Sequence, residues 1–169
     1  MFKRKNLHRF NETMGSAFYN AIHIIHTKYN DDASNLWNDC PSSGELICRF
    51  LNFDRVGIKI ATMAANILSR DYGVKLKDKF AIDVSPDVHV KRVMYRLGLI
   101  DEIDNVVFSE IPLEKVTYAA RSINPEFPGV FDKLFWEIGQ NKICQNDACH
   151  GNECPFGDFC IRQGINSNR

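Results

Sequence analysis

Apolar side chains recur at every third or fourth position along much of the chain, which is the spacing of helices with one buried face. Between residues 11 and 29 this face consists of Met14, Ala17, Phe18, Ala21, Ile22, Ile25 and Tyr29. A second such face, Val90, Val93, Met94 and Leu97, predicts a helix that starts at Ser85-Pro86-Asp87 and ends at Gly98. No segment alternates in polarity long enough to form a sheet. We therefore predict an all-α protein.

Start and stop signals place the other helices. Asp31 and Asp32 can cap a short helix over 33–37, and Ser42 with Glu45 forms a capping-box pattern that predicts a helix to Leu51. A tight turn over 52–57 then leads into small and apolar residues over 58–68, which predict a buried helix. Further helices are expected from Pro112 to about Ile123 and over 129–139, and 71–85 is expected to be a loop.

Composition narrows the function classes. The 169 residues are 44% hydrophobic and 25% charged, which suits one globular unit or one domain with a small appendage, and the formal net charge is zero. The chain therefore has no general polyelectrolyte character, and any contact with nucleic acid must be local. A basic cluster over residues 3–9 is either a solvated end or an arm that binds the DNA backbone. No run of about 18 apolar residues and no signal core occurs, so we expect a cytoplasmic protein without a membrane span.

Four of the six cysteines lie in the last 26 residues. Cys144, Cys149, Cys154 and Cys160 are spaced C-x4-C-x4-C-x5-C in a segment too short and polar to form its own core. In a reducing compartment such thiols point to a metal centre, which can supply the stability that packing cannot. Four thiolates suit a 4Fe-4S cluster or a zinc ion, and the absence of close C-x2-C pairs favours iron and sulfur. Cys40 and Cys48 are expected to be ordinary buried or half-buried residues.

The predicted hairpin over 46–68 has chemistry of its own. Gly57 stands at the entry to its second helix, where unpaired backbone N–H groups at the positive end of the helix dipole can hold a DNA phosphate. The alternative is that the hairpin merely packs, as most short helical hairpins do.

Three segments together resemble one protein family. The sequence Phe53-Asp54-Arg55-Val56-Gly57-Ile58-Lys59-Ile60-Ala61 resembles the helix-hairpin-helix signature L-P-G-V-G-x-K-T-A of endonuclease III-type DNA glycosylases. The segment Asp87-Val88-His89-Val90-Lys91-Arg92-Val93 is similar to their V-D-T-H-x-x-R-V segment, and residues 154–160 resemble the end of their cluster loop. The three motifs occur in the family's order over most of the chain, from about residue 11 to 161.

The resemblance implies a division and a set of roles. It implies a partial six-helix glycosylase-like region over 1–140 and an iron-sulfur loop and tail over 141–169, with Lys59 and Asp87 as catalytic residues. Arg55, Val56 and Gly57 would bind the DNA backbone. The expected activity is excision of a damaged base from duplex DNA followed by abasic-site lyase action through a lysine Schiff base. The expected partner is double-stranded DNA with a damaged base or an abasic site, and the expected state is a monomer.

The sequence also departs from the family's pattern. Arg55 stands where the family has glycine and Asp54 where it has proline, the interval from Lys59 to Asp87 is longer, and Cys149 comes earlier than the family's second cysteine. The family carries additional helices before the segment that begins near Asn11, so a truncated form is one expectation.

Without the resemblance, other readings of the same residues remain. Lys59 can be a solvated residue on an outer helix face, Asp87 can be an N-cap, and His89 can satisfy a local hydrogen bond. At the level of function the alternatives are a non-catalytic iron-sulfur DNA-binding module and a zinc-stabilised helical interaction domain.

Overall fold

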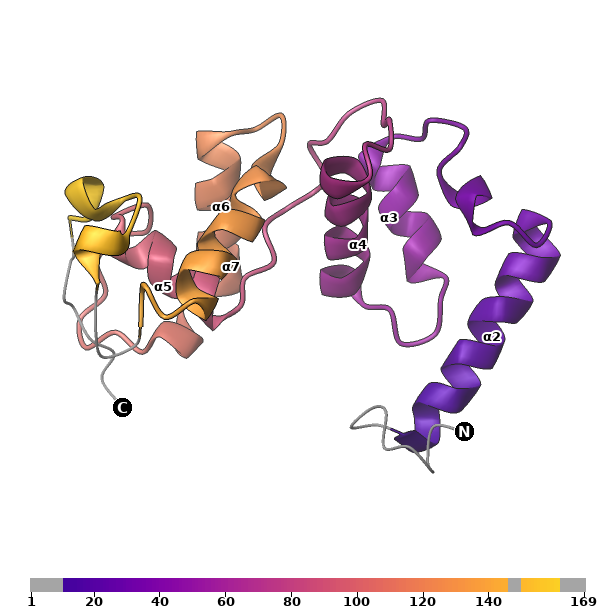
Figure 1. Cartoon of the computed structure of the whole chain (residues 1–169), viewed down its shortest axis with the longest axis horizontal. Coiled ribbons are helices and arrows are strands. Elements are labelled where there is room, and N and C mark those ends of the chain that lie inside the picture. Colours follow the sequence, from indigo (N-terminus) through magenta and orange to yellow (C-terminus); the bar gives the residue numbers. More distant parts are fainter. Residues whose placement is uncertain (1–10, 146–149, 162–169) are drawn as a thin grey trace. The chain divides into compact units, whose positions relative to one another are not determined.

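The protein was analysed as a computed structural model that describes residues 11–145 and 150–161. Every regular element within these residues is a helix, as the sequence predicts (Figure 1). The chain divides into two compact units, 1–81 and 82–169. The boundary after residue 140 that the resemblance implies remains a prediction. The basic cluster over residues 3–9 and Cys149 lie outside the described residues.

Within residues 11–81, the described part of the first unit, there are four helical segments in the order that the sequence predicts. They are α2 (Asn11–Tyr29), the 3-10 turn η1 (Ala33–Leu36), α3 (Ser43–Leu51) and α4 (Ile58–Asp71). The Asp32 side chain caps η1 by accepting a hydrogen bond from the Ser34 amide at 2.8 Å. Ser42 and Glu45 form the expected capping box at the start of α3, and the Ser42 amide that donates to the Glu45 carboxylate lowers the pKa of that carboxyl.

Helices α3 and α4 lie side by side and form the core of the first unit (Figure 1). Leu46, Ala61 and Ala65 are fully buried where small side chains on α4 allow close approach. Ile58 and Ile60, however, are 65% and 48% exposed. The expectation of a wholly buried helix is therefore wrong for one face of α4, because α3 alone covers only the opposite face.

The two isolated cysteines also differ from expectation. Cys40 and Cys48 are both exposed, not buried or half-buried. Cys48 lies on α3 directly after the buried pair Leu46 and Ile47, and the helical turn carries it to the outer face. Cys40 lies in the turn before Pro41, where its φ of 54° is left-handed.

The second unit is arranged around one buried helix. Its segments are α5 (Val88–Arg96), η2 (Phe108–Glu110), α6 (Leu113–Ile123), η3 (Pro128–Phe131), α7 (Asp132–Gln140), η4 (Gly151–Glu153) and η5 (Gly157–Phe159). The helix expected over 129–139 is thus split into a 3-10 turn and α7. Asp87 caps the start of α5, and Gly98, with a φ of 75°, follows its end as the sequence predicts.

The core of this unit includes the cysteine segment. Val90, Val93 and Met94 of α5 are almost completely buried against Phe135 and Ile138 of α7. The same cluster contains Cys144, with Cys154 and Phe156 packed against it. The segment after α7 therefore shares the apolar core of α5 and α7.

Among the helices of the described residues, none is long and apolar enough to cross a membrane.

Helices α5 and α7 approach closely at one glycine. A Cβ added at Gly139 would lie 2.5 Å from Cβ and 2.8 Å from Nδ1 of His89. We expect Gly139→Ala to lower the free energy of unfolding by about 1–3 kcal/mol, because the added methyl group overpacks this contact. Gly15→Ala is the matched control, since nothing lies within 4 Å of a Cβ at that helical glycine. It should stabilise α2 by about 0.5–1 kcal/mol. Urea unfolding followed by circular dichroism measures both, and equal midpoints for the two variants would contradict the contact.

Candidate functional site

The turn between α3 and α4 forms a tight hairpin. Asn52 ends α3, the Phe53 amide donates to the Phe50 carbonyl at 3.1 Å, and the Val56 amide donates to the Phe53 carbonyl at 3.1 Å. Gly57 then opens α4 in an extended conformation. The predicted hairpin is therefore present, with its second helix starting at Ile58 as the sequence analysis places it.

Arg55 occupies the strained position of this hairpin. Its φ is 63°, in the left-handed region that costs a residue with a Cβ roughly 1–2 kcal/mol. The family's signature has glycine at the matching place. The backbone of this turn thus keeps the conformation that glycine favours, while the side chain adds an exposed guanidinium group.

The N-terminus of α4 is open. No side chain caps it, and Gly57, Ile58 and Lys59 are all exposed. The first amides of a 14-residue helix therefore face solvent at the positive end of its dipole. Lys59 is the second residue of this helix and is itself exposed.

A contact from α2 supports the turn. The Asn20 side-chain amide donates to the Asp54 carboxylate in the middle of the hairpin turn. Between α2 and the hairpin lies an apolar groove whose lining includes Phe18, Phe53 and Ile60. Sequence reasoning did not find this link, because a hydrogen bond across 34 residues leaves no periodic signal.

Asp87 lies at the start of α5 in the second unit. Its Oδ1 accepts hydrogen bonds from the amides of His89 at 2.9 Å and Val90 at 3.0 Å, so the expected N-cap role is confirmed. Oδ2 makes no hydrogen bond with any of the described residues. His89 makes a local contact, with its Nδ1 3.0 Å from Nη2 of Arg92.

The structure places the expected site residues in two groups. Arg55, Val56, Gly57 and Lys59 are together at the hairpin of the first unit, whereas Asp87 and the described cysteines belong to the second. The convergence of Lys59 and Asp87 on one substrate remains a prediction from the resemblance.

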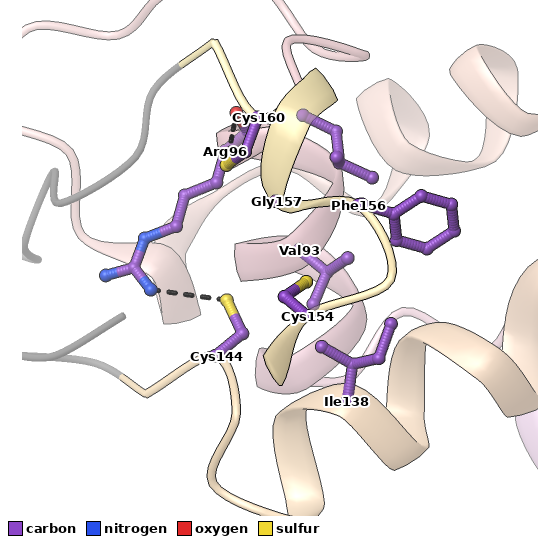
Figure 2. Close-up of a pocket in the computed structure, with 9 residues that line it drawn as sticks. Val93, Arg96, Ile138, Cys144, Cys154, Phe156, Gly157 and Cys160 are labelled. Atoms are coloured by element: carbon purple, nitrogen blue, oxygen red, sulfur yellow. Dashed lines mark hydrogen bonds between the residues drawn. The ribbon is translucent and has the colours of Figure 1, made fainter. Parts of the chain in front are cut away.

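Three of the four expected ligands line one cavity. Cys144, Cys154 and Cys160 face it together with Val93 and Arg96 of α5 and with apolar residues that include Ile138 and Phe156 (Figure 2). The cavity is small in this structure, with a volume of about 10 Å³ for the centre of a water-sized sphere. Cys144 is buried, and Cys154 and Cys160 are half-buried.

Two buried arginines of α5 hold this segment. Arg96 is 1% exposed, and its Nη1 lies 2.6 Å from the carbonyl oxygen of Gln145 and 3.2 Å from Sγ of Cys144. The thiol of Cys160 in turn lies 3.3 Å from the carbonyl oxygen of Arg96, so one residue contacts two of the cysteines (Figure 2). Arg92 donates from Nε to the carbonyl of Cys144 at 2.8 Å.

These contacts bear on whether the residues suit a metal centre. No group of three His, Cys, Asp or Glu side chains within 11–145 and 150–161 stands close enough to hold one metal ion. The three thiols nevertheless share one cavity, and a guanidinium donor to Cys144 suits a sulfur with negative charge. The thiols and the guanidinium donor are of the chemical types that suit a thiolate centre, and the four-cysteine cluster remains a prediction from the sequence.

Sequence reasoning named neither arginine of α5 as part of the site. Arg92 and Arg96 are four residues apart, so they share one helix face, and that face also holds apolar core positions. The sequence did contain a signal that could have identified them: both arginines fall on the apolar side of an amphipathic helix. Charged groups are rarely buried there without a partner.

Comparisons with protein-family models, with curated proteins and with solved structures each find no match for this chain.

If the cysteines bind the metal centre that the sequence predicts, removal of the Arg96 guanidinium should weaken metal binding. We expect Arg96→Met to lower metal affinity about 10- to 100-fold, the range typical for loss of a group that orients a ligand. Chelator competition, with iron and zinc measured by elemental analysis, tests this. Arg121→Met is the control, because Arg121 pairs with Asp83 on the surface of the same unit. Equal metal retention in the two variants would show that Arg96 only fills space.

Proposed function

We propose that this chain acts in base-excision DNA repair as a DNA glycosylase with abasic-site lyase activity. The single observation that supports this most is the hairpin of the first unit, in which the uncapped N-terminus of α4 and the exposed residue Lys59 belong to the same helical turn. The same few residues thus offer a phosphate site and a nucleophile.

Binding to DNA would begin at the hairpin. The uncapped amides at the start of α4 can donate to a phosphate without any side-chain charge, and Arg55, two residues before Gly57, adds a cation to the same turn. Because the chain has a net charge of zero, such a local site is the form that DNA binding would take here.

The chemistry would start from Lys59. Its neutral amine attacks C1′ of the damaged nucleotide, and the new C–N bond replaces the glycosidic bond, whose electron pair leaves with the base. The base takes up a proton. Opening of the sugar then gives an imine between Lys59 and C1′, and removal of a C2′ proton expels the 3′ phosphate and cleaves the strand.

Asp87 would serve the same sugar with its second carboxylate oxygen. The cap hydrogen bonds occupy Oδ1 and fix the plane of the group, which leaves Oδ2 for the positive charge that develops on the sugar or for proton transfer from the lysine. A cap and a catalytic carboxylate are therefore compatible roles for this side chain.

The four cysteines would hold a 4Fe-4S cluster in this proposal. Cys144, Cys154 and Cys160 share a cavity, and Cys149 would complete the set. When bound, the centre supplies folding free energy by cross-linking a segment that is poor in apolar side chains. A colourless protein with one zinc ion per chain would instead support a zinc-stabilised interaction domain.

Arg55 should have two separable effects. Arg55→Gly relieves the left-handed strain and is expected to raise the free energy of unfolding by about 1 kcal/mol, whereas Arg55→Ala keeps the strain. Both variants lack the guanidinium. For duplex DNA, each should reduce the slope of log affinity against log salt by about 0.9, the value for one lost phosphate contact. Unfolding curves and a salt titration measure the two effects, and an unchanged slope would remove Arg55 from the DNA surface.

Borohydride trapping tests the nucleophile. Reduction of an imine formed with abasic duplex DNA should leave the wild-type chain covalently attached, and Lys59→Gln and Lys59→Arg should both abolish this product on a denaturing gel. Lys75→Gln is the matched control, because Lys75 is also exposed in the first unit but lies far from the hairpin in sequence.

Two other outcomes have definite meanings. Trapping that survives Lys59→Gln would assign the nucleophile to another residue. Salt-sensitive duplex binding without any trapped wild-type product would favour the non-catalytic DNA-binding module.

A further inference from the structure

A buried carboxylate on α7 contacts the segment that leads to Asp87. Asp132 is the first residue of α7 and is 9% exposed. Its Oδ1 accepts a hydrogen bond of 2.6 Å from the backbone amide of Ser85, which lies 47 residues earlier. Removing a carboxylate from water costs free energy unless hydrogen bonds replace the lost hydration. The hydrogen bond from the Ser85 amide provides part of this compensation and connects Asp132 to the segment before α5.

The Ser85 backbone passes this constraint to Asp87. The Asp87 amide donates to the Ser85 carbonyl at 2.7 Å, closing a tight turn over Ser85-Pro86-Asp87. Pro86 fixes its own φ and leaves the turn little freedom. Asp132 binds the Ser85 amide, and Asp87 follows Ser85 by only two residues. The position of the Asp87 side chain therefore depends on where Asp132 holds Ser85.

The Ser85 side chain does not hold the turn itself. Its Oγ is buried and has no hydrogen-bond partner among the described residues. Within the part of the chain that the structure describes, Ser85 is thus fixed by two backbone hydrogen bonds, one to Asp132 and one from Asp87. Of these, the bond to Asp132 is the one that ties the turn to a neighbouring helix.

We propose that Asp132 is a positioning residue for Asp87: by fixing the Ser85 amide, it sets the direction in which the Asp87 carboxylate projects from the start of α5. The role rests on the proposed function, in which Oδ2 of Asp87 faces the sugar. Asp132 itself does not touch substrate in this scheme.

The test compares variants of Asp132 that distinguish the loss of its hydrogen-bond acceptor from the loss of its negative charge. Asp132→Asn keeps an Oδ1 acceptor, and Asp132→Ala removes it. In Asp132→Ala, hydrogen exchange at the His89 and Val90 amides, which Asp87 caps, should accelerate relative to the Leu97 amide at the other end of α5. Trapping on abasic DNA should slow about 10- to 100-fold, as expected for a misplaced catalytic group.

Restoration by the conservative variant distinguishes positioning from general stability. Asp132→Asn should return both readouts to near the wild-type values, and Asp101→Asn, at an exposed site of the same unit, should leave both unchanged. Where Asp132→Ala does not fold, Asp132→Glu displaces the carboxylate by one methylene and should still slow trapping.

Two results would overturn the proposal. The first is a uniform loss of protection along α5 in Asp132→Ala, with the ratio of His89 to Leu97 exchange unchanged. The second is failure of Asp132→Asn to restore that ratio. If the wild-type chain gives no trapped product, the proposed function fails, and the exchange ratios alone decide whether Asp132 holds Asp87.

Discussion

The guanidinium of Arg96 lies inside the second unit, and the cysteine segment is arranged around it. Removing a guanidinium group from water is expensive unless polar groups replace the lost hydration. Arg96 contacts a carbonyl oxygen and a sulfur, and its guanidinium also stands 5.3 Å from the centre of the Phe108 ring. A negative charge on the sulfur would compensate the buried cation better than a neutral thiol can. The proposed anionic centre and the buried arginine therefore favour each other.

Helix α5 connects this centre to the proposed chemistry. Asp87 caps its first turn, and Arg92 and Arg96 extend from its later turns to the cysteine segment. Arg96 lies nine positions after Asp87, which corresponds to a rise of about 13 Å along the helix. The N-cap contact and the contacts to the cysteine segment are thus made from a single helix. His89 of the same helix packs closely on Gly139 of α7.

Local signals in the sequence were sufficient for the helices. Apolar periodicity predicted α2 and α5, and the Ser42 and Glu45 pair predicted the start of α3, because caps and helix faces depend on residues within a few positions. The contacts that hold the candidate site span long intervals: 47 residues separate Ser85 from Asp132 and 48 separate Arg96 from Cys144. Such pairs have no periodic or spacing signature. For the same reason the sequence did not reveal which face of α4 stays exposed.

The departure of Arg55 from the glycine pattern then has a physical interpretation. A left-handed arginine costs stability in a turn that glycine would form without strain, and such strain persists where another requirement outweighs it. Under the proposed function, a chain with no net charge would attract phosphate through a few donors concentrated at one place. Arg55 precedes the uncapped N-terminus of α4 by two residues, so in the proposed function its charge would add to the field of the helix dipole. Arginine in place of glycine at position 55 would therefore both strain the backbone of the turn and increase its affinity for a DNA phosphate.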